Sequence, residues 1–299
     1  MRRTASTALA LALLLPAGAH AYKRTAIVGP NQRPIEGTCL YWDTRAISWS
    51  PAADLGGNLP ADEALRALRL SFDEWAAYDC SDLRFAEGAP VAREVGYSDR
   101  GRNTNVVLFR DVPCAEVAPA EARCWYEGGC GDVYDCWEHE SQLIAVTTTT
   151  FSQCTGRIVD ADIEMNAASF HFTTGGGEPC HRGGGDNCVD TDVRNTLVHE
   201  IGHLIGLDHS TVPAATMYAS APPGETQKRS LHEDDIAALC DIYPAGEPTW
   251  TCAPARPPAE CGEGRSASGT TTTCSTGGAG LALLGIVPLL LWGRRRRSV

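Results

Sequence analysis

Three histidines and a glutamate are spaced so that they could act on one metal ion, in the run His199-Glu-Ile-Gly-His-Leu-Ile-Gly-Leu-Asp-His209. Residues four apart share one face of an α-helix, so His199 and His203 can direct ring nitrogens at the same ion. Gly206 can adopt left-handed backbone angles, which would let the chain leave the helix and present His209. Three imidazoles leave a fourth position for water, as in catalytic zinc sites, and Glu200 could accept a proton from that water.

A helix must hold the first two histidines, and the sequence predicts one from about Val193 to Ile205. Asp192 is a favourable N-cap, and apolar residues recur at helical spacing behind it. These apolar residues are Leu197, Val198, Ile201, Leu204 and Ile205. A core helix that carries histidines by chance would share this pattern, but it would not need Gly206 and His209 at their fixed offsets.

A second interpretation keeps the zinc ion and takes a downstream glutamate, Glu225 or Glu233, as the third ligand. Glu225 follows two prolines and a glycine and is therefore predicted to lie in a loop. Glu233 stands three residues after Ser230, the spacing of a capping box, which would use its carboxylate at a helix start. His209 is therefore the preferred third ligand.

The stretch H-E-I-G-H-L-I-G-L-D-H-S resembles the zinc signature of the metzincin peptidases, and most closely that of the matrixin branch. Met217, in Ala-Thr-Met-Tyr, resembles the Met-turn that lies beneath the metal in that clan and is not a ligand. The resemblance implies an α+β catalytic domain with a mixed twisted sheet, a backing helix, an active-site helix and a C-terminal helix. It also implies a zinc endopeptidase in which His199, His203 and His209 bind one Zn²⁺ ion and Glu200 is the general base.

Two further stretches resemble matrixin strands. Residues 143–151, Leu-Ile-Ala-Val-Thr-Thr-Thr-Thr-Phe, resemble the edge strand along which these enzymes bind an extended substrate by strand addition. In residues 158–165 polar and apolar side chains alternate, which predicts a half-buried strand. Asp160, Asp162 and Glu164 share one face of it, as on a solvated surface; because matrixins carry calcium near the equivalent segment, they are also candidate Ca²⁺ ligands.

The remaining elements suit the same class of domain. Residues 61–78 are predicted to form a long amphipathic helix that begins at Pro60 and backs the sheet. Residues 39–49 and 103–109 are predicted strands, and Ser230 is predicted to begin a helix that ends before Pro244. This order of elements predicts an α+β fold with a mixed sheet.

Composition divides the chain into four parts. Residues 1–21 have the charged start, apolar run and small-residue end of a secretory signal peptide. Residues 22–244 are long enough for one catalytic domain, whereas residues 245–276, rich in Pro, Gly, Ser and Thr, are predicted to be a flexible stalk. Residues 277–299 contain an apolar run followed by four arginines, which predicts a membrane anchor with the catalytic domain outside.

Cys274 stands just ahead of this apolar run. Together with the run and the arginines, it resembles the C-terminal sorting signals of myxobacterial surface proteins. The resemblance implies that export and sorting machinery processes the chain near Cys274. We therefore expect membrane contact through the C-terminal segment before processing, and a mature protein at the cell surface or outside the cell.

Cysteine content and charge agree with export. Twelve of the thirteen cysteines precede Cys274, an even set that predicts up to six disulfides in an oxidising compartment. Cys180 and Cys188 bracket a glycine-rich loop and could close it, whereas His171 and His181, which flank that loop, receive no role. The formal net charge of −12 argues against nucleic acid as a partner.

These features together predict an exported zinc endopeptidase that acts on polypeptides. Two alternatives stay open at this point: a zinc-containing surface adhesion or binding module without catalysis, and a hydrolase of cell-wall peptides. Glu200 favours catalysis over the binding module, because a purely structural zinc ion needs no general base and normally has no open position.

Overall fold

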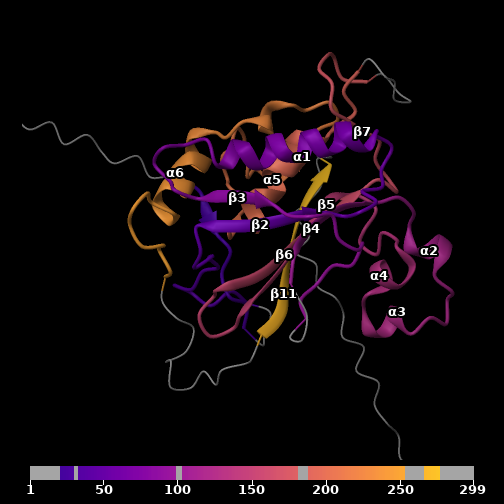
Figure 1. Ribbon diagram of the computed structural model, residues 1–299, viewed down its shortest axis with the longest axis horizontal. Coiled ribbons are helices and arrows are strands. Elements are labelled where there is room, and N and C mark those ends of the chain that lie inside the picture. Colours follow the sequence, from indigo (N-terminus) through magenta and orange to yellow (C-terminus); the bar gives the residue numbers. More distant parts are fainter. Residues whose placement is uncertain (1–20, 30–32, 99–102, 181–187, 253–265, 277–299) are drawn as a thin grey trace, which may run out of the picture.

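A seven-stranded mixed sheet in the order β10-β11-β5-β6-β4-β2-β3 forms the centre of the computed structural model, which describes residues 21–29, 33–98, 103–180, 188–252 and 266–276 (Figure 1). The sheet and its covering helices confirm the predicted α+β class. All of the predicted signal peptide except Ala21, the whole of the predicted anchor and His181 lie outside the described residues.

The sheet combines a parallel part with an antiparallel part. Its parallel strands are β2 (Ala46–Pro51), β3 (Arg84–Glu87), β4 (Asn105–Arg110) and β6 (Ile158–Asn166). On the other side of β6 lies β5 (Leu143–Ser152), which is antiparallel to it. Beyond β5 come β11 (Ser266–Thr276), antiparallel to β5, and β10 (Ser220–Ala221), parallel to β11.

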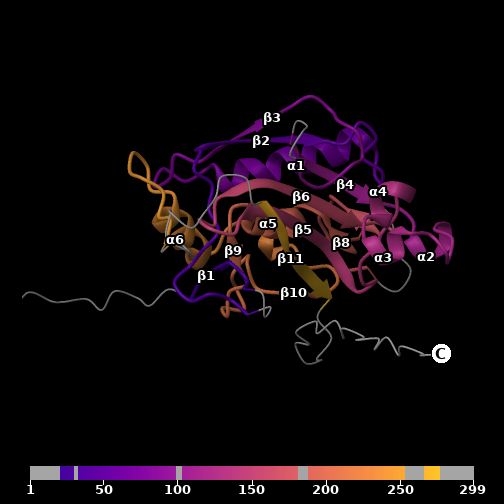
Figure 2. The same cartoon turned by 90° about the horizontal axis from the view of Figure 1, so that it is seen from below.

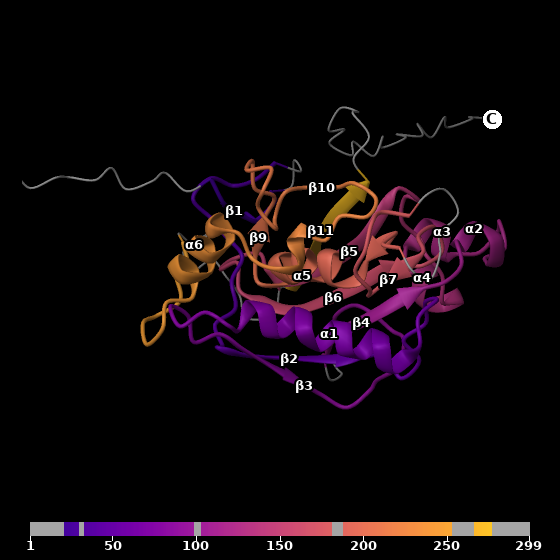
Figure 3. The same ribbon diagram turned by 90° about the horizontal axis from the view of Figure 1, so that it is seen from above.

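Alternation along the strands sends apolar side chains to one face, where α1 (Ala61–Trp75) and α5 (Val193–Leu204) cover the sheet side by side (Figures 1 and 3). Phe109 and Ile163 point to this face and belong to the main core. The Trp75 indole of α1 donates a hydrogen bond of 2.7 Å to the Val198 carbonyl of α5. This contact joins the backing helix directly to the helix that carries the histidines.

Three short helices lie between β4 and β5 in sequence, at the end of the molecule opposite to α6 (Glu233–Ile242) (Figures 1 and 3). They are α2 (Cys114–Val117), α3 (Cys124–Glu127) and α4 (Cys130–Tyr134). Disulfides Cys114–Cys136 and Cys124–Cys130 hold them together. Such short helices need this support, because their own hydrogen bonds are too few to stabilise them.

The disulfides seen in the structure agree with an oxidising compartment. Besides the two in the short helices, they are Cys39–Cys252, Cys80–Cys240 and Cys180–Cys188, and Cys154 is also disulfide-bonded. Cys180–Cys188 closes the glycine-rich loop, as the sequence indicated.

The structure corrects the expected stalk. Residues 266–276 form strand β11 along β5, so the prediction of a flexible stalk is wrong for this part of the chain. The sequence of this segment explains the difference, because Thr270–Thr273 is a run of β-branched residues with strong strand preference. A second consequence is that β5 is not the edge of the sheet, since β11 covers it.

The start of α6 also differs from expectation. His232, and not Ser230, is the N-cap, and Asp235 completes the capping box through the His232 backbone. Glu233 therefore does not play the predicted capping role.

Short elements complete the described structure: β1 (Lys23–Arg24), β7 (Phe172–Thr173), β8 (Thr191–Asp192), β9 (Leu207–Asp208) and a 3₁₀ turn at Gln227–Arg229.

No helix in the described ranges has both the length and the apolar character that crossing a bilayer requires.

Candidate metal centre and catalytic residues

Helix α5 begins one residue after Asp192 and carries His199, Glu200 and His203 in its last two turns. The Asp192 side chain accepts a hydrogen bond of 2.8 Å from the Asn195 N–H, as the predicted cap requires. Every residue from Asn195 to Leu204 is buried, because α5 packs against α1 as well as against the sheet. The two histidines are therefore held on a rigid element.

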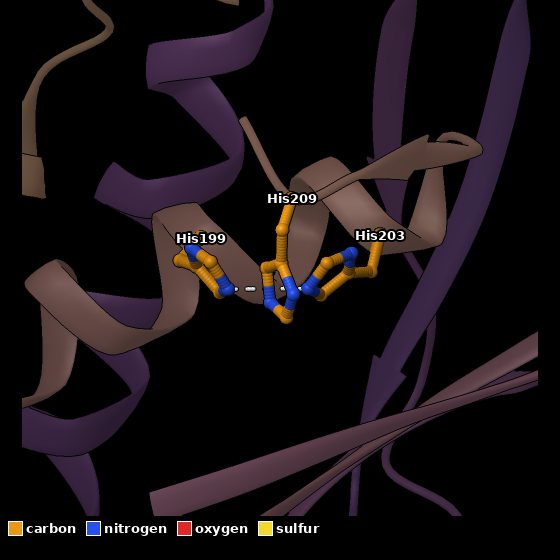
Figure 4. A group of neighbouring side chains, drawn as sticks. All are labelled: His199, His203 and His209. Carbon is orange, nitrogen blue, oxygen red and sulfur yellow. Dashed lines mark hydrogen bonds between the residues drawn. The ribbon is translucent and has the colours of Figure 1, made fainter. Parts of the chain in front are cut away.

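The structure brings the three predicted histidine ligands together (Figure 4). Their ligand atoms all lie within 4.8 Å of one another, and the Nε2 atoms of His199 and His203 are 3.1 Å apart. His199 and His203 are fully buried, whereas His209 is half-buried at the margin of the site. Among the described residues this is the one cluster of three or more groups able to bind a metal ion.

Backbone carbonyls fix which nitrogen of each buried ring can face a metal ion. The Nδ1 atom of His199 lies 2.6 Å from the Thr216 carbonyl, and that of His203 lies 2.8 Å from the Leu207 carbonyl. A carbonyl only accepts, so Nδ1 carries the proton in both rings and Nε2 keeps its lone pair. The pKa of His199 and of His203 lies well below the usual 6.5, mainly because of burial and then because of neighbouring positive groups. Neutral rings with converging Nε2 atoms fit a zinc ion.

The corner after α5 places the third histidine, and Gly206 makes that corner. Its φ of +95° is in the left-handed region, and a Cβ at this position would lie 2.6 Å from the Leu40 carbonyl oxygen. The freed carbonyls at the helix end find other donors, since the Trp42 indole binds Leu204 O and the Tyr243 hydroxyl binds Ile205 O. The predicted exit from the helix at Gly206 thus has both a backbone reason and a steric reason.

Met217 lies directly beneath α5, where the Met-turn was predicted. It is 1% exposed, and a Cβ added to Gly202 of α5 would collide with its sulfur. The turn is held from below by Asp235 of α6, whose carboxylate accepts hydrogen bonds from Thr216 N (2.7 Å) and Met217 N (3.0 Å). Because Thr216 O also binds His199, Asp235 supports this histidine through one intervening residue.

Glu200 points from α5 toward the sheet. Its Oε2 accepts a hydrogen bond of 2.6 Å from the Thr147 hydroxyl of β5, and it is fully buried. Thr147 thereby fixes one oxygen of the carboxylate next to the histidine cluster.

Residues 130–244 match the sequence model of the matrixin family. Shorter stretches of the chain are similar to known peptidases. The match to "Metalloendoproteinase 1" of Glycine max is 48% identical over 52 residues, which is 17% of each chain. The match to "Metalloendoproteinase 2-MMP" of Arabidopsis thaliana is 32% identical over 106 residues, 34% of this chain and 27% of that protein. The match to "Matrix metalloproteinase-9" of Canis lupus familiaris is 44% identical over 64 residues, 20% of this chain and 9% of that protein.

The chain thus spans less than a third of the length of each of these relatives. The matches support a matrixin-like metalloprotease, which is the coarser part of the predicted resemblance. They do not test the resemblance to a C-terminal sorting signal, which stays a prediction.

Neither glutamate of the alternative ligand set lies in the histidine cluster. Glu225 contacts Lys228, with 3.9 Å between the charged atoms, and Glu233 is exposed in the first turn of α6. His171 lies 3.1 Å from the Asn58 amide nitrogen and takes no part in the site either.

The three acids of β6 share one face of the strand, as predicted, but they do not form one cation site. Glu164 binds the Arg110 guanidinium at 2.6 Å, and Asp162 accepts hydrogen bonds from the Gly96 and Val106 backbones. Asp160, Asp162 and Glu164 are therefore not among the groups whose ligand atoms converge as a metal site requires in the described part of the chain. All three carboxylates are buried, so the alternative prediction of a solvated surface is wrong for this face of the strand.

Four residues around the site were missed from the sequence: Thr147, Gly202, Asp234 and Asp235. Asp234 accepts hydrogen bonds from Ala21 N (2.7 Å) and Tyr22 N (3.0 Å), and its other oxygen binds the Ser210 hydroxyl. Ser210 directly follows His209, so the N-terminal segment is linked to the third histidine. The cluster of acids at the start of α6 was the available signal, but the sequence indicated only a helix start there.

Proposed function

We propose that this protein is an exported zinc endopeptidase in which His199, His203 and His209 bind one Zn²⁺ ion and Glu200 is the general base. The observation that supports this most directly is the convergence of ligand nitrogens beside a buried carboxylate. Zinc bound there would acidify a water molecule and polarise the peptide carbonyl.

The chain's own residues would carry the proton. Glu200 accepts it from the attacking water and delivers it to the leaving amine, while the Thr147 hydroxyl holds the carboxylate in place. His199 and His203 stay neutral because burial lowers their pKa and their Nδ1 protons bind backbone carbonyls. An extended polypeptide would bind along β5 by strand addition in place of β11, with main-chain hydrogen bonds supplying affinity.

Export and proteolytic processing of the chain follow from its two terminal segments. We infer that cleavage after Ala21 follows export, that Cys274 marks C-terminal processing, and that the segment from residue 277 contacts the membrane before that processing. The catalytic domain would then act at the cell surface or outside the cell. Intact-mass analysis of the exported protein tests both ends, since a mature chain that begins before Tyr22 or that retains residues 277–299 would contradict this route.

The substitution Glu200→Gln tests the role of the carboxylate. We expect the variant to retain about one zinc ion per chain, because no ligand is lost, and to lose about 100- to 10,000-fold in kcat. Zinc is measured by elemental analysis and turnover with a quenched peptide, with and without a chelator. Glu233→Gln is the matched control: it removes an exposed carboxylate and should keep both zinc and activity.

The outcome also separates the alternatives. A binding module would hold zinc and cleave nothing in either variant. A cell-wall hydrolase would act on purified peptidoglycan and spare a library of linear peptides. Substantial turnover by Glu200→Gln would contradict the assignment of the general base.

A further inference from the structure

Strand β11 lies between β5 and β10 in the sheet and contacts α5 (Figures 2 and 3). It runs antiparallel to β5 from Ser152 to Leu143 and parallel to β10 at Ser220–Ala221. One segment near the end of the chain therefore joins two elements of the matrixin-like domain. β10 has no other strand partner among the described residues.

The register places the centre of β11 beside the catalytic glutamate. Thr147, whose hydroxyl binds Glu200, stands opposite Thr272. The next pairs, Val146 with Thr273 and Ala145 with Cys274, continue along the same stretch of β5. Helix α5, which carries Glu200 and two of the histidines, is in contact with β11.

The backbone of β11 pairs with the N–H and C=O groups of β5 that a polypeptide substrate would need. If a substrate binds by adding a strand to β5, it must pair with the outward N–H and C=O groups of that strand. In the structure those groups face β11 over nearly the whole length of β5. Two strands cannot occupy one edge, so binding of β11 and of an external polypeptide is mutually exclusive.

The composition and pairing of residues 266–276 suit a strand that can be displaced. Residues 266–276 contain no charged residue, and the run Thr270–Thr273 favours an extended backbone. The pairing shows register shifts between Ser268 and Thr270 and between Cys274 and Ser275. Each shift interrupts the ladder and leaves backbone groups less well paired than in a regular strand.

We propose that residues 266–276 act as a built-in competitive inhibitor that occupies the substrate edge of β5 and restrains cleavage of other polypeptides. This inference rests on the proposed endopeptidase function, since a restraint requires an activity to restrain. Detachment of this segment from the domain would remove the competitor and open the edge. A cut near Cys274, at the far end of this segment, would leave residues 266–273 attached, so C-terminal processing there would not by itself open the edge.

The test replaces Thr272 and Thr273 by proline in the full chain. In a strand, neighbouring N–H groups point to opposite sides, so one of these two prolines must remove a hydrogen bond to β5. We expect hydrogen exchange of β5 amides to accelerate while β6 amides stay protected, which shows that the domain is folded. We also expect kcat/KM for an external peptide to rise by at least about tenfold, because a bound competitor lowers apparent affinity by mass action.

The matched control is Thr272→Val with Thr273→Val, which keeps both N–H donors and the β-branched shape. It should behave like the parent chain in exchange and in turnover. Equal β5 exchange in the proline variant and the parent would overturn the occupancy. Faster exchange without any gain in kcat/KM, in a chain that does cleave peptides, would overturn the restraint.

Two other results separate this inference from the proposed function. Changed exchange in a chain that cleaves no peptide before or after substitution would support occupancy of the edge and contradict the endopeptidase. Cleavage within residues 266–276 that Glu200→Gln abolishes would make the segment a substrate, which overturns its role as a restraint and supports the endopeptidase.

Discussion

Asp160 is a buried carboxylate without a hydrogen-bond donor among the described residues. It is 1% exposed, and neither of its oxygens has a partner there. Burial raises the pKa of Asp160 to about 6, and burial together with the Asp160 charge raises the pKa of Asp162. The ordinary value for aspartate is 3.8, so between pH 4 and pH 6 the native protein binds more protons than the unfolded chain. The stability that this group contributes is complete at low pH and is lost as the pH rises through about 6.

The substitution Asp160→Asn removes this titration. We expect the free energy of unfolding to exceed that of the parent by about 1–3 kcal/mol at pH 8, with little or no gain at pH 4. Urea unfolding of chelated protein at both pH values measures the difference. Glu116→Gln, at an exposed position, is the control and should show no pH-dependent gain. A gain of the same size at both pH values would contradict the elevated pKa.

At the scale of elements, α5 packs closely against the turn at residues 215–218 because Gly202 has no side chain at the contact. Gly202 faces the Met217 sulfur, and its Cβ would also lie 3.1 Å from a Trp75 ring carbon. Interiors are close-packed, so an extra methyl group here must push the turn or the helix aside. Thr216 of the same turn orients His199, so a shift of the turn reaches the metal centre.

Gly202→Ala should therefore weaken both the fold and the metal site. We expect a loss of about 1–3 kcal/mol in the free energy of unfolding, together with weaker zinc affinity. Thermal unfolding and competition with a chelator measure the two effects. Gly175→Ala, where a Cβ would meet no atom within 4 Å, is the control. Unchanged zinc affinity with a lowered melting temperature would mean that the turn does not transmit the strain.

Elements with local signals were predictable from the sequence, and elements fixed by distant contacts were not. Apolar spacing and the Asp192 cap predicted α5 to within a residue of its end, and Gly206 predicted the exit toward His209. The predicted N-cap of α6 was wrong. Asp235, which completes the observed capping box, also accepts hydrogen bonds from Thr216 N and Met217 N, and the sequence near α6 gives no sign of these contacts. β11 was missed because its pairing with β5 links residues more than a hundred positions apart. Low-complexity composition gave no sign of such a partner.

At the scale of the whole molecule, Arg110 joins the sheet to the short helices α2–α4. Its fully buried guanidinium binds Glu164 of β6 at 2.6 Å, Asp132 of α4 at 2.7 Å and Asp135 at 2.8 Å. Burial alone would raise the pKa of Glu164, but His139 and Arg110 hold it below its ordinary value. This network attaches the helical segment to one end of the sheet, while the two disulfides within the segment hold its short helices together.

Replacing Arg110 by methionine keeps the bulk of the side chain and leaves Glu164 buried without its cation. We expect a loss of about 3–5 kcal/mol in the free energy of unfolding. Arg69→Met is the matched control, since Arg69 forms an exposed pair with Glu87, and it should cost less than about 1 kcal/mol. Denaturant titrations of both variants provide the measurement. Equal losses in the two would show that the buried network does not hold the two parts together.

Disulfide Cys39–Cys252 fastens the chain to the domain shortly before β11 begins at Ser266. A strand attached through a short linker has an effective concentration at its binding site on the order of 1 mM. An external peptide of similar affinity must approach that concentration to compete with β11 for β5. Dilution does not free the edge of β5 while the linker is intact. Cys154 is disulfide-bonded as well, and the five other pairs leave only cysteines beyond residue 252 to bind it. Release of the strand as a separate molecule outside the cell would therefore depend on reduction of this bond as well as on cleavage of the linker.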